Sequence, residues 1–155
     1  MEPEGNIEFR KALLKDIASI KALVQKLYLH DNINYNESQV SATLEELITD
    51  EESGSVWLII FNNNIAGYLI LINTFSVEFG GRVLFIDELF IDEKSRGNGL
   101  GKSAIAFAEE YALEKGIKAV RLEVELSNKI AHDVYLRSGF TEHERYIMTK
   151  RVNKN

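Results

Sequence analysis

The feature that most restricts the fold of this chain is a strand-like apolar run that leads through a glycine-rich loop into an amphipathic helix. Residues 83–91 are nearly continuous in apolar side chains, which is typical of a strand buried on both faces. The loop at residues 96–103 reads RGNGLGKS, and the helical pattern of residues 99–115 ends before Gly116, a typical C-cap residue. Backbone N–H groups and the positive end of the helix dipole meet at such a loop, so the sequence predicts an anion-binding site.

Two familiar phosphate-binding motifs do not match this loop. A Walker A loop requires glycine at position 96, where the chain has Arg96, and a dinucleotide fingerprint requires the spacing G-x-G-x-x-G. The glycines here are Gly97, Gly99 and Gly101. The sequence therefore favours neither an ATPase nor a Rossmann dehydrogenase. A flexible strand-to-helix turn that binds nothing is the other interpretation of the glycines.

The remaining patterns predict a mixed α/β domain. The only proline is Pro3, and no linker or repeat interrupts the chain, so we expect a single domain over residues 1–155. Asparagines at positions 62–64 separate two β-branched runs and predict a hairpin turn. The predicted elements, in the order β-α-α-β-β-β-α-β-α-β, are residues 7–9, 17–27, 36–49, 55–61, 65–75, 83–91, 99–115, 119–126, 128–139 and 140–152.

The composition restricts the chemistry and the partners. The chain has no cysteine, which excludes disulfides, thiolate metal sites and acyl transfer through a cysteine. A formal net charge of -6 disfavours nucleic acids and anionic membranes; it suits a cationic small molecule, or simply keeps the protein dispersed. The three histidines are scattered, so no metal is expected. The absence of a long apolar run and of a signal-peptide pattern at the start predicts a cytoplasmic protein.

A second motif follows the glycine loop. The loop from Arg96 to Gly101 fits the pattern Arg/Gln-x-x-Gly-x-Gly/Ala, and residues 128–140, NKIAHDVYLRSGF, fit the pattern Asn-x-x-Ala-x-x-x-Tyr-x-x-x-Gly-Phe. Both patterns, and the distance between them, are typical of the GNAT superfamily of N-acetyltransferases. The chain resembles that superfamily specifically over residues 83–140, and before residue 83 in the order of its elements. Glu93 departs from the proline that many members have after the strand, and we expect this to alter only the turn.

The resemblance implies an α/β fold with a mixed, mostly antiparallel central sheet that is flanked by helices and splayed at the acetyl-CoA site. It makes acetyl-CoA the acyl donor, held through its pyrophosphate by the loop amides and through its pantetheine arm by the backbone of the preceding strand. The N-terminal half would form the substrate side, and residues 83–140 the acetyl-CoA-binding core. The residues that the resemblance assigns to acetyl-CoA are Leu89, Phe90, Ile91, Arg96, Gly97, Asn98, Gly99, Leu100, Gly101, Lys102, Ser103, Asn128, Ala131, Tyr135 and Arg137.

Two neighbouring carboxylates interrupt the apolar strand and are candidate general bases. Asp87 and Glu88 are adjacent, and neighbouring strand side chains point to opposite faces, so at least one should face a covered surface. A partly desolvated carboxylate could accept the proton that an alkyl ammonium, with a pKa of about 10.4, must lose before it attacks a thioester. Asp87 is the first choice and Glu88 the alternative. In the alternative interpretation neither residue is catalytic: one carboxylate forms a salt bridge and the other lies at the solvated, splayed end of the sheet.

Tyr135 is the candidate general acid. It lies on the apolar side of its predicted helix with Ala131, where a packed aromatic side chain is the simpler interpretation. The resemblance implies that its phenol protonates the departing CoA thiolate. We therefore expect Tyr135 to be catalytic.

The resemblance implies an enzyme that moves an acetyl group from acetyl-CoA directly to a primary amine. Residues 85–91, FIDELFI, resemble the corresponding strand of diamine (spermidine/spermine) acetyltransferases, so we expect a small cationic amine or polyamine. Asp31 or Glu78 could help Asp87 and Glu88 to hold it. The alternatives are a protein or peptide N-acetyltransferase, an acyl-CoA-binding sensor without turnover, and a module that binds another nucleotide. Exposed edges of the first and last strands could pair two copies into a homodimer.

Overall fold

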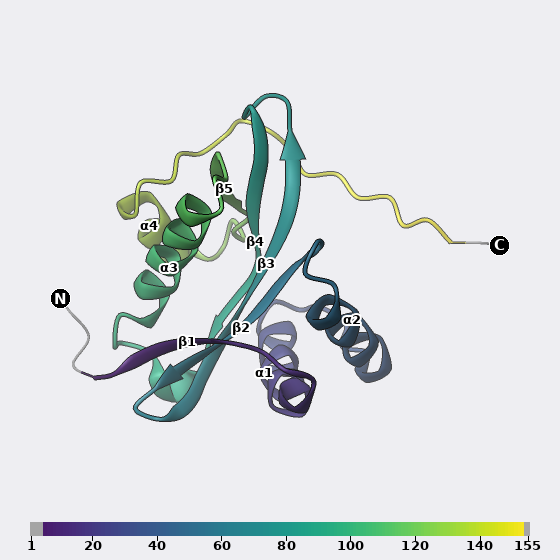
Figure 1. Ribbon diagram of the computed structural model, residues 1–155, viewed down its shortest axis with the longest axis vertical. Coiled ribbons are helices and arrows are strands. Elements are labelled where there is room, and N and C mark those ends of the chain that lie inside the picture. The colour runs from purple at the N-terminus through teal and green to yellow at the C-terminus, as the bar shows by residue number, and fades with distance from the viewer. Residues whose placement is uncertain (1–4, 154–155) are drawn as a thin grey trace. The chain divides into compact units, whose positions relative to one another are not determined.

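The computed structural model describes residues 5–153, and the chain divides into two compact units, Met1–Glu123 and Val124–Asn155. The first unit holds a five-stranded sheet in the order β1-β2-β3-β4-β5 (Figure 1). Neighbouring strands pair antiparallel from β1 to β4, and β5 pairs parallel with β4. The strands are β1 (Ile7–Lys11), β2 (Gly54–Phe61), β3 (Asn64–Ser76), β4 (Gly81–Ile91) and β5 (Ala119–Leu122).

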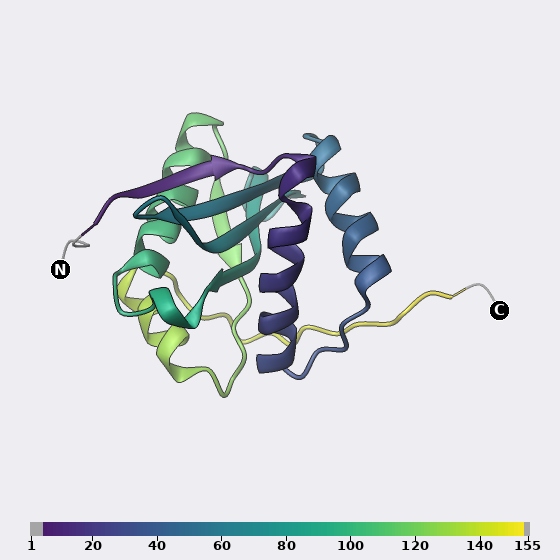
Figure 2. The ribbon, with the colours of Figure 1, turned by 90° about the horizontal axis from the view of Figure 1, so that it is seen from below.

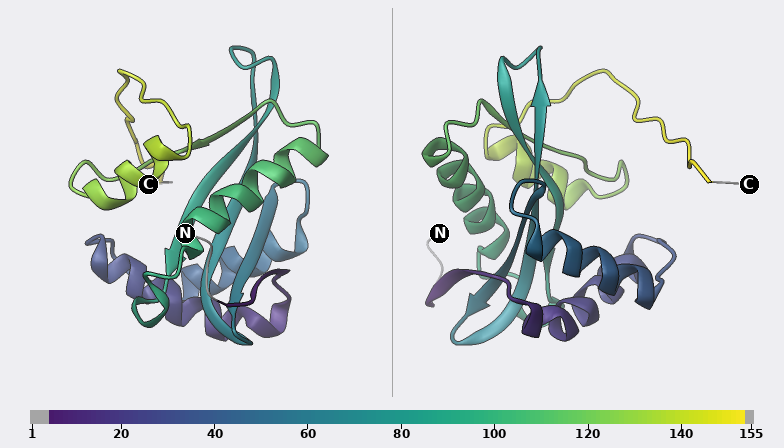
Figure 3. Two further views of the ribbon diagram at one scale, coloured as in Figure 1. Left: turned by 90° about the vertical axis from the view of Figure 1, so that its left-hand side faces the viewer. Right: turned by 45° about the vertical axis from the view of Figure 1, so that its right-hand side comes forward.

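Helices cover both faces of this sheet. The first two helices lie on one face and α3 lies on the other (Figure 2), and Figure 3 shows α3 crossing its face obliquely. Asn36 caps α2 by accepting a hydrogen bond from the backbone N–H of Gln39. The helices of the first unit are α1 (Ile17–His30), α2 (Glu37–Thr49) and α3 (Leu100–Glu114), with the 3-10 turns η1 (Leu14–Asp16) and η2 (Glu93–Ser95).

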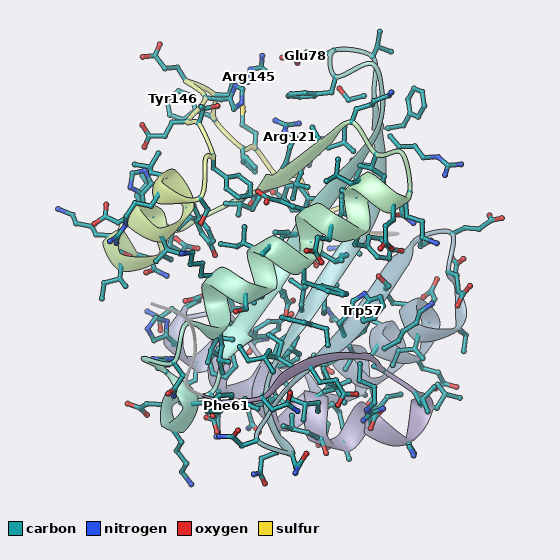
Figure 4. All side chains as sticks on the ribbon, turned by 60° about the vertical axis from the view of Figure 1, so that its left-hand side comes forward. Trp57, Phe61, Glu78, Arg121, Arg145 and Tyr146 are labelled. Atoms are coloured by element: carbon teal, nitrogen blue, oxygen red, sulfur yellow. The ribbon has the colours of Figure 1, made fainter. Side chains whose placement is uncertain are left out.

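Two apolar clusters hold these layers together. One packs α1 and α2 against the sheet around Ile20 and Tyr68, both of which are fully buried. The other packs α3 against the opposite face around Leu84. Trp57 of β2 lies on the α3 side of the sheet (Figure 4), with its ring centroid 4.8 Å from that of Phe107 in an edge-on contact. The sheet is therefore a rigid platform buried on both faces.

A β-bulge interrupts β4 at Asp87. Ile70 of β3 pairs with Glu88 and the next residue of β3 pairs with Ile86, so Asp87 has no partner on β3. Ile86 packs in the α3 cluster, whereas Phe90, four residues later, packs in the cluster of α1 and α2. A regular strand would place both side chains on one face of the sheet. The bulge therefore reverses which face the side chains after it point to.

The structure differs from the sequence-based expectation at two strands. The predicted strand over residues 119–126 ends at Leu122, because β5 pairs with β4 only as far as Ile86 and the bulge ends the ladder there. The predicted strand over residues 140–152 is wrong, since the structure describes all of these residues and none of them forms a strand. Tyr146 is 97% exposed and Met148 is 90% exposed, so the apolar side chains of this segment are not buried as those of a sheet strand would be.

The second unit contains α4 (Lys129–Arg137). Asn128 caps this helix by accepting a hydrogen bond from the backbone N–H of Ala131, and Gly139 follows it with φ 93°, as the sequence predicts. Within the described residues, no helix is both long enough and apolar enough to cross a membrane.

Candidate active site

The side chain of Glu88 is fixed by two tyrosines from two different elements. The hydroxyl of Tyr28, near the end of α1, donates to Oε2 of Glu88 at 2.9 Å. The hydroxyl of Tyr68, in β3, donates to Oε1 at 2.7 Å. Each carboxylate oxygen keeps a further lone pair, because an ionised carboxylate offers about four acceptor positions. Glu88 is therefore held in one orientation and can still accept a proton.

Asp87 borders the same cavity as Glu88 but is less constrained. It is the bulged residue of β4 and is largely exposed, while the surrounding protein desolvates its carboxylate and raises its pKa. We expected the two carboxylates to point to opposite faces of the strand. The bulge breaks that alternation, so both line one cavity on the side of α1 and α2.

This cavity is acidic. It has a volume of about 380 Å³ and lies between the first two helices, the middle of β3 and the second half of β4. The charged residues among its described lining are Glu46 of α2 and Asp50 at its C-cap together with Asp87 and Glu88, and none is Lys, Arg or His. Such a lining favours a cation over an anion.

The two other acidic residues proposed from the sequence have different positions. The charge of Asp31 helps to raise the pKa of Glu88, so this carboxylate acts on the cavity electrostatically. Glu78 lies in the turn between β3 and β4 (Figure 4) and is not among the residues that line the cavity. Asp31 therefore lies within electrostatic reach of Glu88, and neither Asp31 nor Glu78 is among the described residues that line the cavity.

The protonation of Glu88 depends on opposing effects. Burial raises the pKa of Glu88, and the charges of Asp87 and Asp31 raise it further, whereas the hydrogen bonds from Tyr68 and Tyr28 lower it. Burial and the charge of Glu88 raise the pKa of both tyrosines well above the usual value, so both phenols stay protonated and donate. A carboxylate with a raised pKa is a stronger base than one in water.

The glycine loop joins the end of β4 to α3. Gly97 and Gly99 have φ of 80° and 73°, a left-handed backbone that glycine adopts without strain. Gly99 is the N-cap of α3 and offers no side chain to cap the helix, so the first N–H groups of α3 lack a capping partner. The Cβ position of Gly101 faces open space. An anion can therefore approach these amides.

Several side chains around the glycine loop contact other parts of the protein. Arg96 donates from Nε to the carbonyl of Ile91 at 3.1 Å, and its guanidinium lies 5.6 Å from the ring centroid of Phe90. The amide of Asn98 donates to the carbonyl of Ser95 and closes the loop. Side chains at several predicted acetyl-CoA positions are thus occupied by the protein itself. Those that are exposed or half-buried are Leu89, Ile91, Arg96, Gly97, Asn98, Gly99, Gly101, Lys102 and Ser103, and those that are buried are Phe90 and Leu100.

The end of β4 also leaves backbone groups without a strand on one side. The described β5 pairs with β4 from Val83 to Ile86, and β4 continues to Ile91. Leu89 and Phe90 pair with β3 on their other side. This is the splaying that the family resemblance implies. Amide groups of an extended ligand can add to such an open strand edge.

The remaining predicted residues lie in the second unit. Burial raises the pKa of Tyr135, so its phenol carries its proton at neutral pH, and its ring makes an edge contact with Phe140 at 5.9 Å between centroids. The side chain of Asn128 is the cap of α4, and Nε of Arg137 donates to the carbonyl of Asp133. The phenol of Tyr135 is in the state that proton donation needs.

Sequence reasoning missed the two tyrosines that hold Glu88. Tyr28 directly follows the helix predicted over residues 17–27, and Tyr68 lies within the strand predicted over residues 65–75. A signal was present, because Tyr68 falls on the same face of its strand as Ile70, and a buried phenol needs a hydrogen-bond partner.

Comparison with known proteins identifies the family. The chain matches the acetyltransferase (GNAT) family over residues 21–140. It is 26% identical to the aminoalkylphosphonate N-acetyltransferase of Salmonella typhimurium over 135 residues, which cover 87% of this chain and 85% of that protein. It is 44% identical to an uncharacterized N-acetyltransferase of Methanocaldococcus jannaschii over 59 residues, or 38% of this chain, and the match spans only 26% of that relative's length.

A solved structure has the same fold. The structure of a possible acetyltransferase from Clostridium difficile 630 superposes with a TM-score of 0.84, covering 96% of this chain and 99% of that chain at 19% identity. The predicted mixed, mostly antiparallel α/β fold is confirmed. The chain belongs to the acetyltransferase (GNAT) family, as the two sequence motifs indicated.

Proposed function

We propose that this protein is an N-acetyltransferase that uses acetyl-CoA to acetylate a primary amine directly. The observation that carries the proposal is Glu88, a carboxylate with a raised pKa that two phenols fix at the wall of an acidic cavity. Glu88 accepts the ammonium proton, directly or through water, and so frees the nitrogen lone pair. As the new N–C bond forms and the C–S bond breaks, Tyr135 gives its proton to the sulfur leaving group, and the second proton that the nitrogen loses passes through water to restore the phenol.

The acyl donor is acetyl-CoA, which the glycine loop and the open edge of β4 would hold. The uncapped first turn of α3 suits the pyrophosphate, and Lys102 adds a positive charge on that turn. Backbone groups from Leu89 to Ile91 would take the amides of the pantetheine arm. When bound, acetyl-CoA supplies the activated acyl group.

The acceptor is a small cationic amine, and a diamine or polyamine fits best. The name of the Salmonella relative describes an amine substrate that also carries an anionic phosphonate. The cavity of this protein has carboxylates at Glu46, Asp50, Asp87 and Glu88 and no cationic side chain among its described lining. It would repel a phosphonate and attract a second ammonium group. This charge pattern supports a polyamine over an aminophosphonate.

A panel of amines with acetyl-CoA, followed by thiol release, tests this function. Diamines and polyamines are expected to give the highest kcat/KM, with aminoalkylphosphonates and peptide amines far below. Turnover of peptides alone would favour the protein acetyltransferase alternative. Stabilisation by acetyl-CoA without thiol release from any amine would favour a sensor, and equal stabilisation by ATP would favour a nucleotide-binding module.

The kcat/KM for a diamine is expected to fall roughly 3- to 10-fold as the salt concentration rises from low to physiological, because salt screens the attraction between a dication and the acidic cavity. A monoamine of the same chain length is the control and should show a smaller decrease. Steady-state rates at several salt concentrations measure the effect. A decrease that is equal for both amines would mean that the second ammonium group is not recognised.

Replacement of Tyr135 by phenylalanine is expected to lower kcat by about 10²-fold, because the phenol proton is lost while the ring is kept. The affinity for acetyl-CoA, measured by calorimetry, should stay unchanged. The ring contact with Phe140 does not involve the hydroxyl, so the melting temperature should hardly change. Unchanged kcat at saturating amine would show that Tyr135 only packs.

A further inference from the structure

The contacts of Glu88 single out two residues that the proposed reaction does not itself use. Tyr28 and Tyr68 come from α1 and β3, and each donates one hydrogen bond to a different oxygen of Glu88. Tyr68 is fully buried, so its hydroxyl has no access to water as an alternative partner. Packing alone does not require these two hydroxyl groups, because phenylalanine would fill almost the same volume without a polar group to bury.

We propose that Tyr28 and Tyr68 are positioning residues that hold Glu88 in its reactive orientation and keep it ionised in the acidic cavity. The inference rests on the proposed function, in which Glu88 is the general base. Burial alone would favour the protonated carboxyl, which cannot accept a proton from the amine. The two phenols oppose that effect. They also occupy one lone pair on each oxygen, which leaves the others for the amine or a water molecule.

The charged surroundings of Glu88 define what the phenols must offset. The charges of Asp87 and Asp31 disfavour its ionised form, and the described lining of the cavity supplies no cation to counter them. The two phenols therefore favour the ionised form of Glu88 against these charges. The titratable groups that face Glu88 are Tyr28 of α1, Asp31 after α1, Tyr68 of β3 and Asp87 of β4. Glu46 of α2 and Asp50, the C-cap of α2, border the same cavity.

The sign of the effect follows from which form the hydrogen bonds stabilise. A phenol that donates to Glu88 stabilises the carboxylate and lowers its pKa. Tyr28→Phe or Tyr68→Phe removes one donor, so the pKa of Glu88 rises. Because the proposed base works when deprotonated, the acid limb of the kcat profile moves to higher pH. A hydrogen bond to a charged group corresponds to a shift of about one pH unit for each phenol.

The first test is independent of turnover. Carbon-13 NMR of the Glu88 carboxyl group, assigned through the Glu88→Gln variant, follows its titration in the wild type, Tyr28→Phe and Tyr68→Phe. The titration midpoint is expected to rise by about one pH unit in each variant. Tyr35→Phe is the matched control, because the Tyr35 ring contacts that of Tyr28 edge-on at 6.3 Å without bonding to Glu88. Unchanged midpoints in both variants would overturn the proposal.

The second test uses the proposed reaction. The pH profile of kcat with the best amine should show the same shift in both variants and none in Tyr35→Phe. In a Glu88→Gln background, adding Tyr28→Phe should cause no further loss, because its effect passes through Glu88. A lower rate without a shifted acid limb would overturn the positioning role. If no amine is acetylated by the wild type, the proposed function fails while the NMR result still decides whether the tyrosines hold the carboxylate. If Tyr68→Phe does not fold, both the NMR titration and the pH profile are measured on Tyr28→Phe alone.

Discussion

Replacement of Glu88 by glutamine is expected to lower kcat by about 10³-fold, because the amide cannot accept the ammonium proton. The substitution keeps the volume of the side chain, and the amide oxygen can still accept a hydrogen bond from one of Tyr28 and Tyr68. The fold and the affinity for acetyl-CoA should therefore be preserved. Initial rates at saturating acetyl-CoA and amine measure the effect, and calorimetry checks the affinity.

Asp87→Asn is the matched control for this variant. Asp87 borders the same cavity but lies at the bulge, largely exposed, so we expect a loss of about 10-fold through weaker attraction of the cation. The pH profile separates the two carboxylates, because removing the true base also removes the acid limb of kcat. A greater loss in Asp87→Asn than in Glu88→Gln would restore Asp87 as the base, which was the first choice from the sequence.

The bulge explains why the sequence could not decide between the two carboxylates. Alternation along a strand is a local rule, and it correctly indicated that one of Asp87 and Glu88 would be covered. The bulge depends on how β4 pairs with β3, where one residue of β4 lacks a partner. No pattern within residues 83–91 records that pairing. The strand was predictable, whereas the direction of its functional side chains was not.

Elsewhere too, features set by neighbouring residues were predictable, and features set by pairing with a distant strand were not. The turn at Asn62 and Asn63 has positive φ at both residues, as the run of asparagines predicts, and Asn36 and Asn128 each cap the helix that follows them. These features depend on a few neighbouring residues. The end of β5 at Leu122 and the failed strand after Phe140 depend on whether a partner strand is present. Local chemistry fixed the loops and caps, and tertiary pairing decided the rest.

Replacement of Gly101 by valine is expected to weaken acetyl-CoA binding by about 10³-fold. The new side chain would stand over the uncapped amides of α3 and separate them from the pyrophosphate, which loses about two hydrogen bonds to a charged group. Gly101 is the better test than Gly99, whose φ of 73° would strain any larger residue and confuse binding with folding. Calorimetric titration with acetyl-CoA measures the affinity.

The structure also supplies the control for this loss. The Cβ of a larger residue at Gly101 meets no atom within 4 Å, so the variant should fold, and its melting temperature without ligand should match that of the wild type. Ala106→Val adds the same branched side chain at an exposed position farther along α3 and should bind acetyl-CoA normally. Unchanged affinity in a folded Gly101→Val protein would remove the pyrophosphate from the first turn of α3. It would leave the backbone edge of β4 and the loop before α3 as the remaining parts of the proposed acetyl-CoA site within residues 5–123.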